Sequence, residues 1–430
     1  MIVDRGGARF SVPAWASAHA RSDRRPLRPW IAAGLFAAAL AAVAYQYAEP
    51  GAPAGTHWCP ALTAVDFIPN HIGTMALRRG LPLYDNLRHL GGDFVDPIPN
   101  HEGILSRTGY PPPVYYLLLP VSGLARGLAW KLWLAGAVGA LTLVMVVLAS
   151  PGGGAAWLAP ALAGALLAFY PVWFVLINGN IAVACLLPLA AGIALLAAGR
   201  SETLAALSVA LAAAVKLYPA LLVLHFASRG RWRLAMKTAA FGAAMAALTG
   251  WGGAWWTALD RMRRYDLFPQ AWYPNASLFS VLMMGGAGFG VSYWAAKVFA
   301  ALVAGLALAW TRRGPETGLP AMYRYGLLSL AMILAPNTNY DYNLVFAAPA
   351  MAAALWDLGR RPAAGRGPLL LMALCYAIIS IPTHWLVTLP VWHGLRPQTA
   401  GMVVNKFWWL LLWYAATAWR YRQLESCGTH

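Results

Sequence analysis

Charged residues are scarce in this sequence, where Asp, Glu, Lys and Arg together make up 11% of 430 residues. Soluble globular proteins carry about 25% charged residues, so this composition excludes an ordinary soluble domain. Hydrophobic residues account for 60% of the chain, and the mean hydropathy is +0.55. We therefore expect an all-α polytopic membrane protein that forms a single integral-membrane domain over residues 1–430.

Acidic residues and cysteines are also few. The chain has 15 acidic residues against 32 basic ones, for a net charge of +17. Such an excess can indicate nucleic-acid binding, but here Lys and Arg cluster between apolar runs, as they do in cytoplasmic loops. We therefore expect no nucleic-acid partner. The cysteines, at positions 59, 185, 375 and 427, are scattered and lack any metal-ligand spacing, so we expect no disulfide framework.

Apolar runs recur along the whole chain, and the arginine-rich segments between them define an expected topology. Both termini should lie in the cytoplasm, with tails at residues 1–28 and 421–430 and no cleavable signal peptide. Residues 203–216 and 218–228 are short and meet at the proline break Lys216-Leu217-Tyr218-Pro219, a feature tolerated where helices line a cavity. In total we expect about twelve transmembrane helices, at 29–48, 128–149, 156–175, 181–199, 203–216, 218–228, 236–254, 291–311, 321–336, 342–357, 368–385 and 403–420.

This topology places the unusual polar residues on the external side. The largest external segment is a loop over residues 49–127, which ends in TGYPPPVYYLLLPVSGLA, an expected interfacial helix. The internal loops contain mainly basic connectors. We therefore expect an integral membrane protein whose active site lies on the external face. The other external segments are 177–180, 255–290, 336–343 and 383–400.

Two charged residues beside apolar runs are the main candidates for chemistry. Asp66 follows the first span and could cap a helix, be a solvated acid of the loop or act as a general base. Positioned proton transfer by a general base increases the rate by about 10²–10⁴-fold. Lys216 ends an apolar run, where a lysine costs roughly 2.5–3.5 kcal/mol at mid-membrane. Its ammonium could extend to the interface or neutralise a lipid phosphate in a cavity. The sequence leaves these alternatives open.

Other external residues suit phosphate or sugar binding. Arginine binds phosphate through paired hydrogen bonds. Besides Lys216, the phosphate candidates are Arg78, Arg79, Arg107, Arg261, Arg263 and Arg264. Amides, hydroxyls and carboxylates suit sugar recognition, although Asn and Asp also cap helices. The candidates for sugar or acceptor binding are Tyr110, Asn178, Asn180, Asn337, Asn339, Tyr340, Asp341, Tyr342 and His384.

Several segments, in order, resemble those of glycosyltransferase family 87, within the GT-C superfamily of polytopic glycosyltransferases. They are VDFIPNHIGTMALRRGLPLYD, GYPPPVYYLLLP, INGNIAVACLLPLAAGIALLAAGR, LAALSVALAAAVKLYPALLVL and APNTNYDYNLV. The resemblance implies a GT-C-like helix arrangement with a large first external loop containing interfacial helices. It also implies inverting transfer of a sugar, most often mannose, from a polyprenyl-phosphate donor to a lipid-linked or glycan acceptor on the external face.

The resemblance also implies residue roles. The family's base aspartate falls on Asp66, its Tyr-Pro-Pro begins at Tyr110, and its lysine before an aromatic residue and proline falls on Lys216. Asp66 would take the proton of the acceptor hydroxyl, while Lys216 and arginines would stabilise the departing polyprenyl phosphate. Lys and Arg can neutralise a monophosphate, so we expect no cofactor and no obligatory metal, although Asp93 and Asp96 form a D-x-x-D pair that could bind one.

The sequence departs from the family pattern in two turns. A Gly-Gln-Val-Asn-like turn is here Asn178-Gly179-Asn180, and a late Trp-Asp-His-Tyr turn reads Tyr340-Asp341-Tyr342-Asn343. The expected partners are membrane lipids, the polyprenyl-phosphate sugar and a glycolipid or glycan acceptor.

A transporter or flippase for a lipid-linked sugar is the alternative function. Ionisable residues within the spans would mark its pathway, and many transporters contain an inverted repeat. Here most charges lie outside the spans, and the hydropathy pattern shows no such repeat. These features favour the glycosyltransferase.

Overall fold

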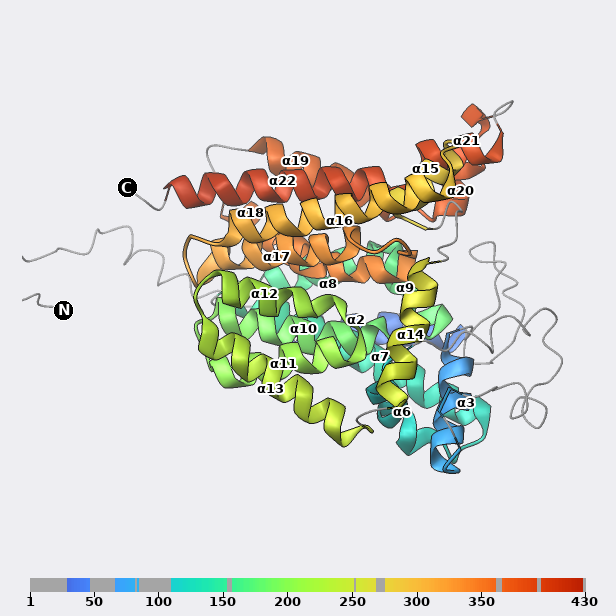
Figure 1. Cartoon of the computed structure of the whole chain (residues 1–430). Coiled ribbons are helices and arrows are strands. Elements are labelled where there is room, and N and C mark those ends of the chain that lie inside the picture. Colours follow the sequence, from blue (N-terminus) through green and yellow to red (C-terminus); the bar gives the residue numbers. More distant parts are fainter. Residues whose placement is uncertain are drawn as a thin grey trace, which may run out of the picture.

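The computed structural model describes residues 29–46, 66–81, 83–84, 110–152, 157–250, 253–267, 275–360, 366–392 and 396–427. Within these ranges every regular element is a helix, apart from one isolated β-bridge between Asn275 and Tyr340, which confirms the predicted all-α class. The long helices lie side by side in a bundle (Figure 1). The expected N-terminal tail and most of the loop over 49–127 lie outside the described residues, whereas residues 421–427 continue the last helix.

The helices follow the chain in this order. The first part contains α2 (Pro29–Gln46), α3 (Phe67–Arg78), α6 (Pro112–Leu118), η2 (Leu119–Val121), α7 (Arg126–Ala149), η3 (Ser150–Gly152), α8 (Leu158–Ala168), α9 (Tyr170–Asn178), α10 (Ala182–Ala197), α11 (Glu202–Val215), η4 (Tyr218–Ala220), α12 (Leu221–Ser228) and α13 (Trp232–Leu248). The second part contains α14 (Gly253–Leu267), α15 (Leu278–Met284), α16 (Phe289–Thr311), α17 (Gly318–Leu334), η5 (Asp341–Ala347), α18 (Ala348–Gly359), α19 (Arg366–Ile379), α20 (Thr383–Val387), η6 (Pro390–Trp392), α21 (Pro397–Val403) and α22 (Lys406–Cys427).

Helices occupy the predicted spans, but their lengths vary. Among the described residues, two helical segments, Gly127–Ala149 and Phe289–Thr311, are long and apolar enough to cross a membrane. The bent pair α8 and α9 adds a third if it counts as one span, and further apolar helices have 10–17 residues. The helices thus have the apolar character of a membrane protein, while the number of twelve spans stays a prediction.

The predicted span 156–175 is not one straight helix. Helices α8 and α9 are bent by 64° at Phe169, which is extended (φ −88°, ψ 101°). Pro171 has no N–H to donate to the carbonyl of Leu167, four residues earlier, so the helix cannot continue unchanged. The indole Nε1 of Trp173 donates to that carbonyl instead, at 2.7 Å. The prediction of a continuous helix was wrong because Pro171 interrupts the backbone ladder.

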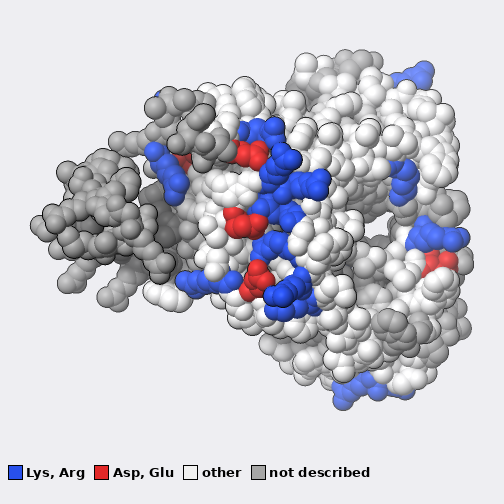
Figure 2. Space-filling model, turned by 60° about the vertical axis from the view of Figure 1, so that its left-hand side comes forward, with Lys and Arg blue, Asp and Glu red and all other residues white. Residues whose placement is uncertain are grey.

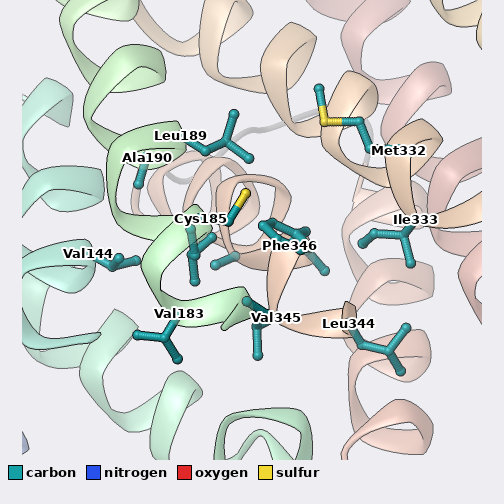
Figure 3. Close-up of a cluster of buried hydrophobic side chains, with 14 of the residues drawn as sticks. Val144, Val183, Cys185, Leu189, Ala190, Met332, Ile333, Leu344, Val345 and Phe346 are labelled. Carbon is teal, nitrogen blue, oxygen red and sulfur yellow. The ribbon is translucent and has the colours of Figure 1, made fainter. Parts of the chain in front are cut away.

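A buried apolar cluster holds η5 against α10 and α17. Figure 3 shows it at the meeting of these elements with α7, and its side chains are almost completely buried. Because η5 also packs on α9, the cluster fixes the tyrosine-rich turn at 340–343 beside the turn between α9 and α10. The labelled residues are Val144, Val183, Cys185, Leu189, Ala190, Met332, Ile333, Leu344, Val345 and Phe346.

Charged side chains gather at one end of the bundle. Figure 2, in which this end comes forward, shows a band of Lys and Arg interspersed with Asp and Glu. Here Arg229 and Arg231 both pair with Glu316, and Arg231 also pairs with Glu202. Helix α22 ends at this side, whereas α3, α6, α14 and α20 lie at the opposite end (Figure 1). The basic connectors are thus separated from the elements that carry the predicted site.

Cysteine labelling tests which end faces outward. In a variant lacking the native cysteines, a cysteine at Gln398, exposed in α21, will react with an impermeant reagent in intact cells. A cysteine at Arg312, exposed after α16, will react only after the membrane is opened. This outcome follows from the retention of arginine-rich loops in the cytoplasm. Labelling of position 312 but not 398 in intact cells would show that the topology is the reverse of the expected one.

Candidate functional site

The site is built around the turn between α9 and α10. Gly179 ends α9 in the left-handed conformation, with φ of 66°. A Cβ atom there would lie 2.6 Å from the Cβ of Phe67 and 2.6 Å from a ring atom of Trp130. Glycine therefore satisfies both the backbone conformation and the close approach of α3. This contact places the residue before α3, Asp66, against the turn.

Asp66 is half-buried, and both its backbone N–H and its backbone carbonyl are hydrogen-bonded. Its N–H donates to the carbonyl of Asn178 at 2.9 Å, and its carbonyl accepts from Nδ2 of Asn70 at 2.7 Å. The Asp66 side chain makes no capping hydrogen bond to α3, so the helix-cap interpretation was wrong. Its Oδ2 instead accepts a hydrogen bond from Nδ2 of Asn180 at 2.9 Å.

The amide of Asn180 connects Asp66 to Lys216. Its Nδ2 also donates to the hydroxyl of Tyr110 at 3.1 Å, and its Oδ1 accepts from the N–H of Ala182 at 2.8 Å and from Nζ of Lys216 at 3.3 Å. Because the Ala182 N–H needs an acceptor, it fixes which way the amide points. Asn180 is fully buried and both of its donors and both lone pairs are occupied, so it has no group left for a sugar. Asn180 orients its neighbours rather than binding sugar as we expected.

Lys216 is a buried cation among neutral groups. It follows α11, is 7% exposed, and its Nζ donates to Oδ1 of Asn343 at 2.7 Å. Nζ also lies 5.2 Å from the ring centre of Tyr342 and 5.8 Å from that of Tyr110. No carboxylate of the described residues pairs with it, and it does not extend to the surface, which rules out the interfacial alternative. Amide oxygens and aromatic faces stabilise the ammonium while leaving its charge available to an anion.

The environment also tunes Asp66 and Tyr110. Burial raises the pKa of the Asp66 carboxyl above its ordinary value of 3.8, although the hydrogen bond from Asn180 and the charge of Lys216 oppose the rise. Burial and the nearby Asp66 raise the pKa of the Tyr110 phenol well above its ordinary value. Asp66 is therefore a stronger base than an exposed aspartate, and Tyr110 stays neutral and able to donate a hydrogen bond.

The structure separates most predicted arginines from Asp66. Arg78 and Arg79 are exposed at the far end of α3, a helix of 12 residues and therefore about 18 Å long. Arg261 of α14 lies closer to the site. Its guanidinium lies over the ring of Tyr84 and donates to the carbonyl of Tyr84, whose hydroxyl donates to the carbonyl of Tyr110 at 2.7 Å. Arg263 is exposed, and Arg107 and the side chain of Arg264 lie outside the described parts of the chain.

Three of the predicted sugar-binding asparagines take part in hydrogen bonds with local backbone or with Asn275. Nδ2 of Asn178 donates to the carbonyl of Phe174 within α9 at 2.9 Å. Asn337 and Asn339 are fully buried. The Asn337 carbonyl accepts from Nδ2 of Asn275 at 3.1 Å, and the Asn339 N–H donates to Oδ1 of Asn275 at 2.8 Å. These contacts secure the chain before α15 and η5, and they do not bring these three amides to Lys216.

The late turn does reach the site, through its tyrosines. The ring of Tyr342 lies under Lys216 and stacks on Phe174 at 6.2 Å between ring centres. The ring of Tyr340 lies 5.6 Å from that of Tyr342. Asp341 is buried and makes an ion pair with Lys406 at 2.9 Å. The backbone of His384 lies in α20, and its side chain is outside the described part of the chain.

The sequence did not indicate Asn343 as a partner of Lys216, or Lys406 and Thr383 as partners of Asp341. Thr383 Oγ1 donates to Oδ2 of Asp341 at 2.9 Å. Lys406 had a visible signal, because it begins the apolar stretch KFWWLLLWY much as Lys216 ends another. Thr383 had none, since a threonine beside an apolar run is ordinary. Among the described residues, no group of three or more His, Cys, Asp or Glu side chains could hold a metal ion, and Asp93 and Asp96 lie outside them.

Comparison with known proteins agrees with the geometry. The model of glycosyltransferase family 87 matches residues 108–336, just over half of the chain. The match includes Tyr110, Asn180 and Lys216, while Asp66 precedes it and the turn at 340–343 follows it. No curated protein matches the chain. Because the family model covers most of the helices around the site, the chain belongs to glycosyltransferase family 87, and the protein is a glycosyltransferase.

Proposed function

We propose that this glycosyltransferase uses a polyprenyl-phosphate sugar and transfers the sugar, with inversion, to a lipid-linked or glycan acceptor. One observation carries the proposal: a single buried amide, that of Asn180, joins the carboxylate of Asp66 to the ammonium of Lys216. A base and an anion-binding cation therefore lie next to each other. Attack by a hydroxyl and departure of a phosphate require both groups.

The geometry supports the following mechanism. Asp66 removes the proton of the acceptor hydroxyl as its oxygen forms a bond to the anomeric carbon. The bond from that carbon to the phosphate oxygen breaks on the opposite face, and its electron pair leaves with the polyprenyl phosphate. Lys216 has three N–H donors and two amide acceptors, which leaves one donor for the phosphate. The hydroxyl of Tyr110 can supply a second.

Two features support a lipid donor that enters from the external side. Helix α6, which begins two residues after Tyr110, exposes the ring of Tyr116 and the apolar side chain of Leu117. An exposed apolar helix beside the site suits a polyprenyl chain. The site also lies at the end of the bundle opposite the basic band, which favours the periplasmic face of the bacterial cytoplasmic membrane. Mannose is the sugar that the family resemblance favours.

A donor screen tests the function. Membranes containing the protein are incubated with radiolabelled polyprenyl-phosphate mannose, glucose, galactose or arabinose, and the labelled glycolipids are separated. We expect one donor to be consumed by the wild type and not by Asp66→Asn. A transporter or flippase would move the labelled lipid across sealed vesicles without consuming it, so lipid movement with an intact donor would exclude a transferase.

The rate of transfer will depend on pH through Asp66. The active base is deprotonated, so the rate is full above its pKa and falls as the pH drops through it. Because that pKa is raised, the fall will begin at a higher pH than for an ordinary aspartate. Asn180→Asp will move the fall to still higher pH, since it replaces a hydrogen-bond donor to Asp66 with a negative charge. The measurement is kcat/KM against pH for both proteins.

The matched control for this shift is Asn180→Leu. Leucine removes the same hydrogen bond without adding charge, so its profile will lie between those of the wild type and Asn180→Asp. If kcat/KM falls at the same acidic pH in all three proteins, Asn180 does not change the pKa of Asp66.

A further inference from the structure

A second buried lysine, Lys406, lies in an arrangement unlike that of Lys216. Lys406 is 1% exposed and its Nζ pairs with Oδ2 of Asp341 at 2.9 Å. Thr383 donates to the same oxygen, and Nζ lies 4.7 Å from the ring centre of Tyr170 at the start of α9. Oδ2 of Asp341 accepts both of these hydrogen bonds. The other oxygen, Oδ1, is buried and has no hydrogen-bond partner among the described residues.

The unused oxygen distinguishes this pair from a structural ion pair in the same protein. Asp357 and Arg420 are also buried, near the basic end of the bundle. There Arg420 donates to Oδ2 at 2.6 Å and to Oδ1 at 3.1 Å, and Tyr323 donates to Oδ2 at 3.0 Å. Every carboxylate oxygen of Asp357 is therefore occupied. A buried carboxylate oxygen without a donor is costly, so the open Oδ1 of Asp341 points to a ligand.

A row of aromatic rings connects the two buried lysines. The ring centres of Tyr170 and Phe174 are 5.5 Å apart, and Phe174 stacks on Tyr342, which lies under Lys216. Phe174 and Tyr342 are half-buried, so the row keeps accessible surface between the polar groups. From Tyr170 to Asn178, beside Asp66, α9 rises by about 12 Å. Lys406, over the ring of Tyr170, thus lies toward the start of α9, whereas Asp66 lies at its end.

Charge decides what this second position can bind. The carboxylate of Asp341 neutralises Lys406, so the pair has no net charge to offer a phosphate, unlike Lys216. Its open atom is an acceptor, which would repel phosphate oxygens and attract a hydroxyl donor. Aromatic rings with a few convergent polar groups are typical of small-molecule sites. The chemistry therefore fits a neutral, hydroxyl-rich ligand.

We infer that the Asp341–Lys406 pair binds hydroxyl groups of the acceptor's sugar. The identification of this ligand as the acceptor rests on the proposed glycosyl transfer. The binding of sugar hydroxyls does not depend on turnover. A sugar hydroxyl donates to Oδ1 of Asp341, whose chain neighbours Tyr340 and Tyr342 are half-buried and aromatic. The pair thereby binds acceptor hydroxyls other than the one that attacks.

Direct binding tests the inference. Octyl α-mannoside, β-glucoside and β-galactoside are titrated, below their micellar concentrations, into the full-length protein in lipid nanodiscs, and binding is followed by saturation-transfer NMR. We expect at least one glycoside to bind saturably to the wild type and about 10-fold or more weakly to the double variant Asp341→Leu, Lys406→Met, which removes a charge-assisted hydrogen bond. Replacing a buried ion pair by apolar residues often preserves stability, so the double variant should stay folded.

Two further variants of the protein serve as controls for this binding measurement. Asp357→Leu, Arg420→Met removes the structural ion pair and will bind the same glycoside as the wild type does. Asp341→Asn keeps the shape of the site, and Lys406 and Thr383 will hold its amide oxygen at the Oδ2 position. An N–H₂ donor then replaces the Oδ1 acceptor, and binding will weaken even if the double variant does not fold. Wild-type affinity in Asp341→Asn, or no saturable glycoside binding to the wild type, overturns the inference, whereas inactivity in the donor screen overturns only the proposed function.

Discussion

Asp66→Asn will lower the rate of sugar transfer at least ~100-fold, because asparagine cannot accept the proton of the acceptor hydroxyl. The variant keeps the size of the side chain and an oxygen for the hydrogen bond from Asn180. Folding and donor binding should therefore persist while chemistry stops. The measurement is kcat with saturating donor and acceptor, together with the melting temperature and donor affinity of the purified protein.

The control is Asp260→Asn, an acid of α14 at the same end of the bundle. Asp260 is half-buried, and its conservative replacement should leave transfer within about twofold of the wild type, because it makes none of the hydrogen bonds of the Asn180 amide. Near-normal turnover by Asp66→Asn would move the base to another acid, and Asp341 would then be the first to test.

Lys216→Met will weaken the use of the donor more than that of the acceptor. Methionine keeps the length and the apolar stem but removes the charge that faces the leaving phosphate. Negative charge on that phosphate grows in the transition state, so kcat should fall together with donor affinity. Removing one such contact typically costs about 10²–10³ in rate. The measurements are kcat and KM for each substrate in turn, and we expect the acceptor KM to change little.

Lys297→Met is the matched control, because Lys297 also lies over a tyrosine ring, that of Tyr293 in α16, at 5.4 Å. It should retain normal donor kinetics. The Lys216 variant removes the lysine donor from Oδ1 of Asn343 and leaves Oδ1 of Asn180 with the Ala182 N–H alone, so its melting temperature must be measured beside its rate. A folded Lys216→Met protein with wild-type donor kinetics would remove Lys216 from the phosphate site and leave Arg261 as the nearest alternative.

The parts of the site that could be predicted from the sequence are those with a local signal. Asp66 and Lys216 are charges next to apolar runs, and such charges need a reason for their desolvation wherever the chain folds. Tyr110 lies in a proline-rich segment that resembles the family pattern. These residues are far apart in the chain, and the structure places all three around the amide of Asn180.

The remaining roles depend on tertiary geometry that residue type does not encode. The amide of Asn180 links two charged groups, whereas Asn337 and Asn339 are fully buried and their backbone groups bond to the side chain of Asn275, although all lie in similar polar turns. Arg78 and Arg79 carry the right charge, but the direction of α3 places them about 18 Å from Asp66 along the helix. Residue type indicates the chemistry that a side chain can perform. The direction of each helix then decides which of these residues lie close together.

The break between α8 and α9 has a consequence for heat resistance. Across it the hydrogen-bond ladder is interrupted at Pro171, and the indole of Trp173 supplies the bond to Leu167. A helix of nine residues is too short to be stable alone, so α9 depends on this indole, its aromatic neighbours and the turn at Gly179. Opening α9 should therefore cost less free energy than unfolding the whole bundle. Because α9 leads directly into Asn180, warming should abolish transferase activity reversibly at temperatures where the rest of the bundle is still folded.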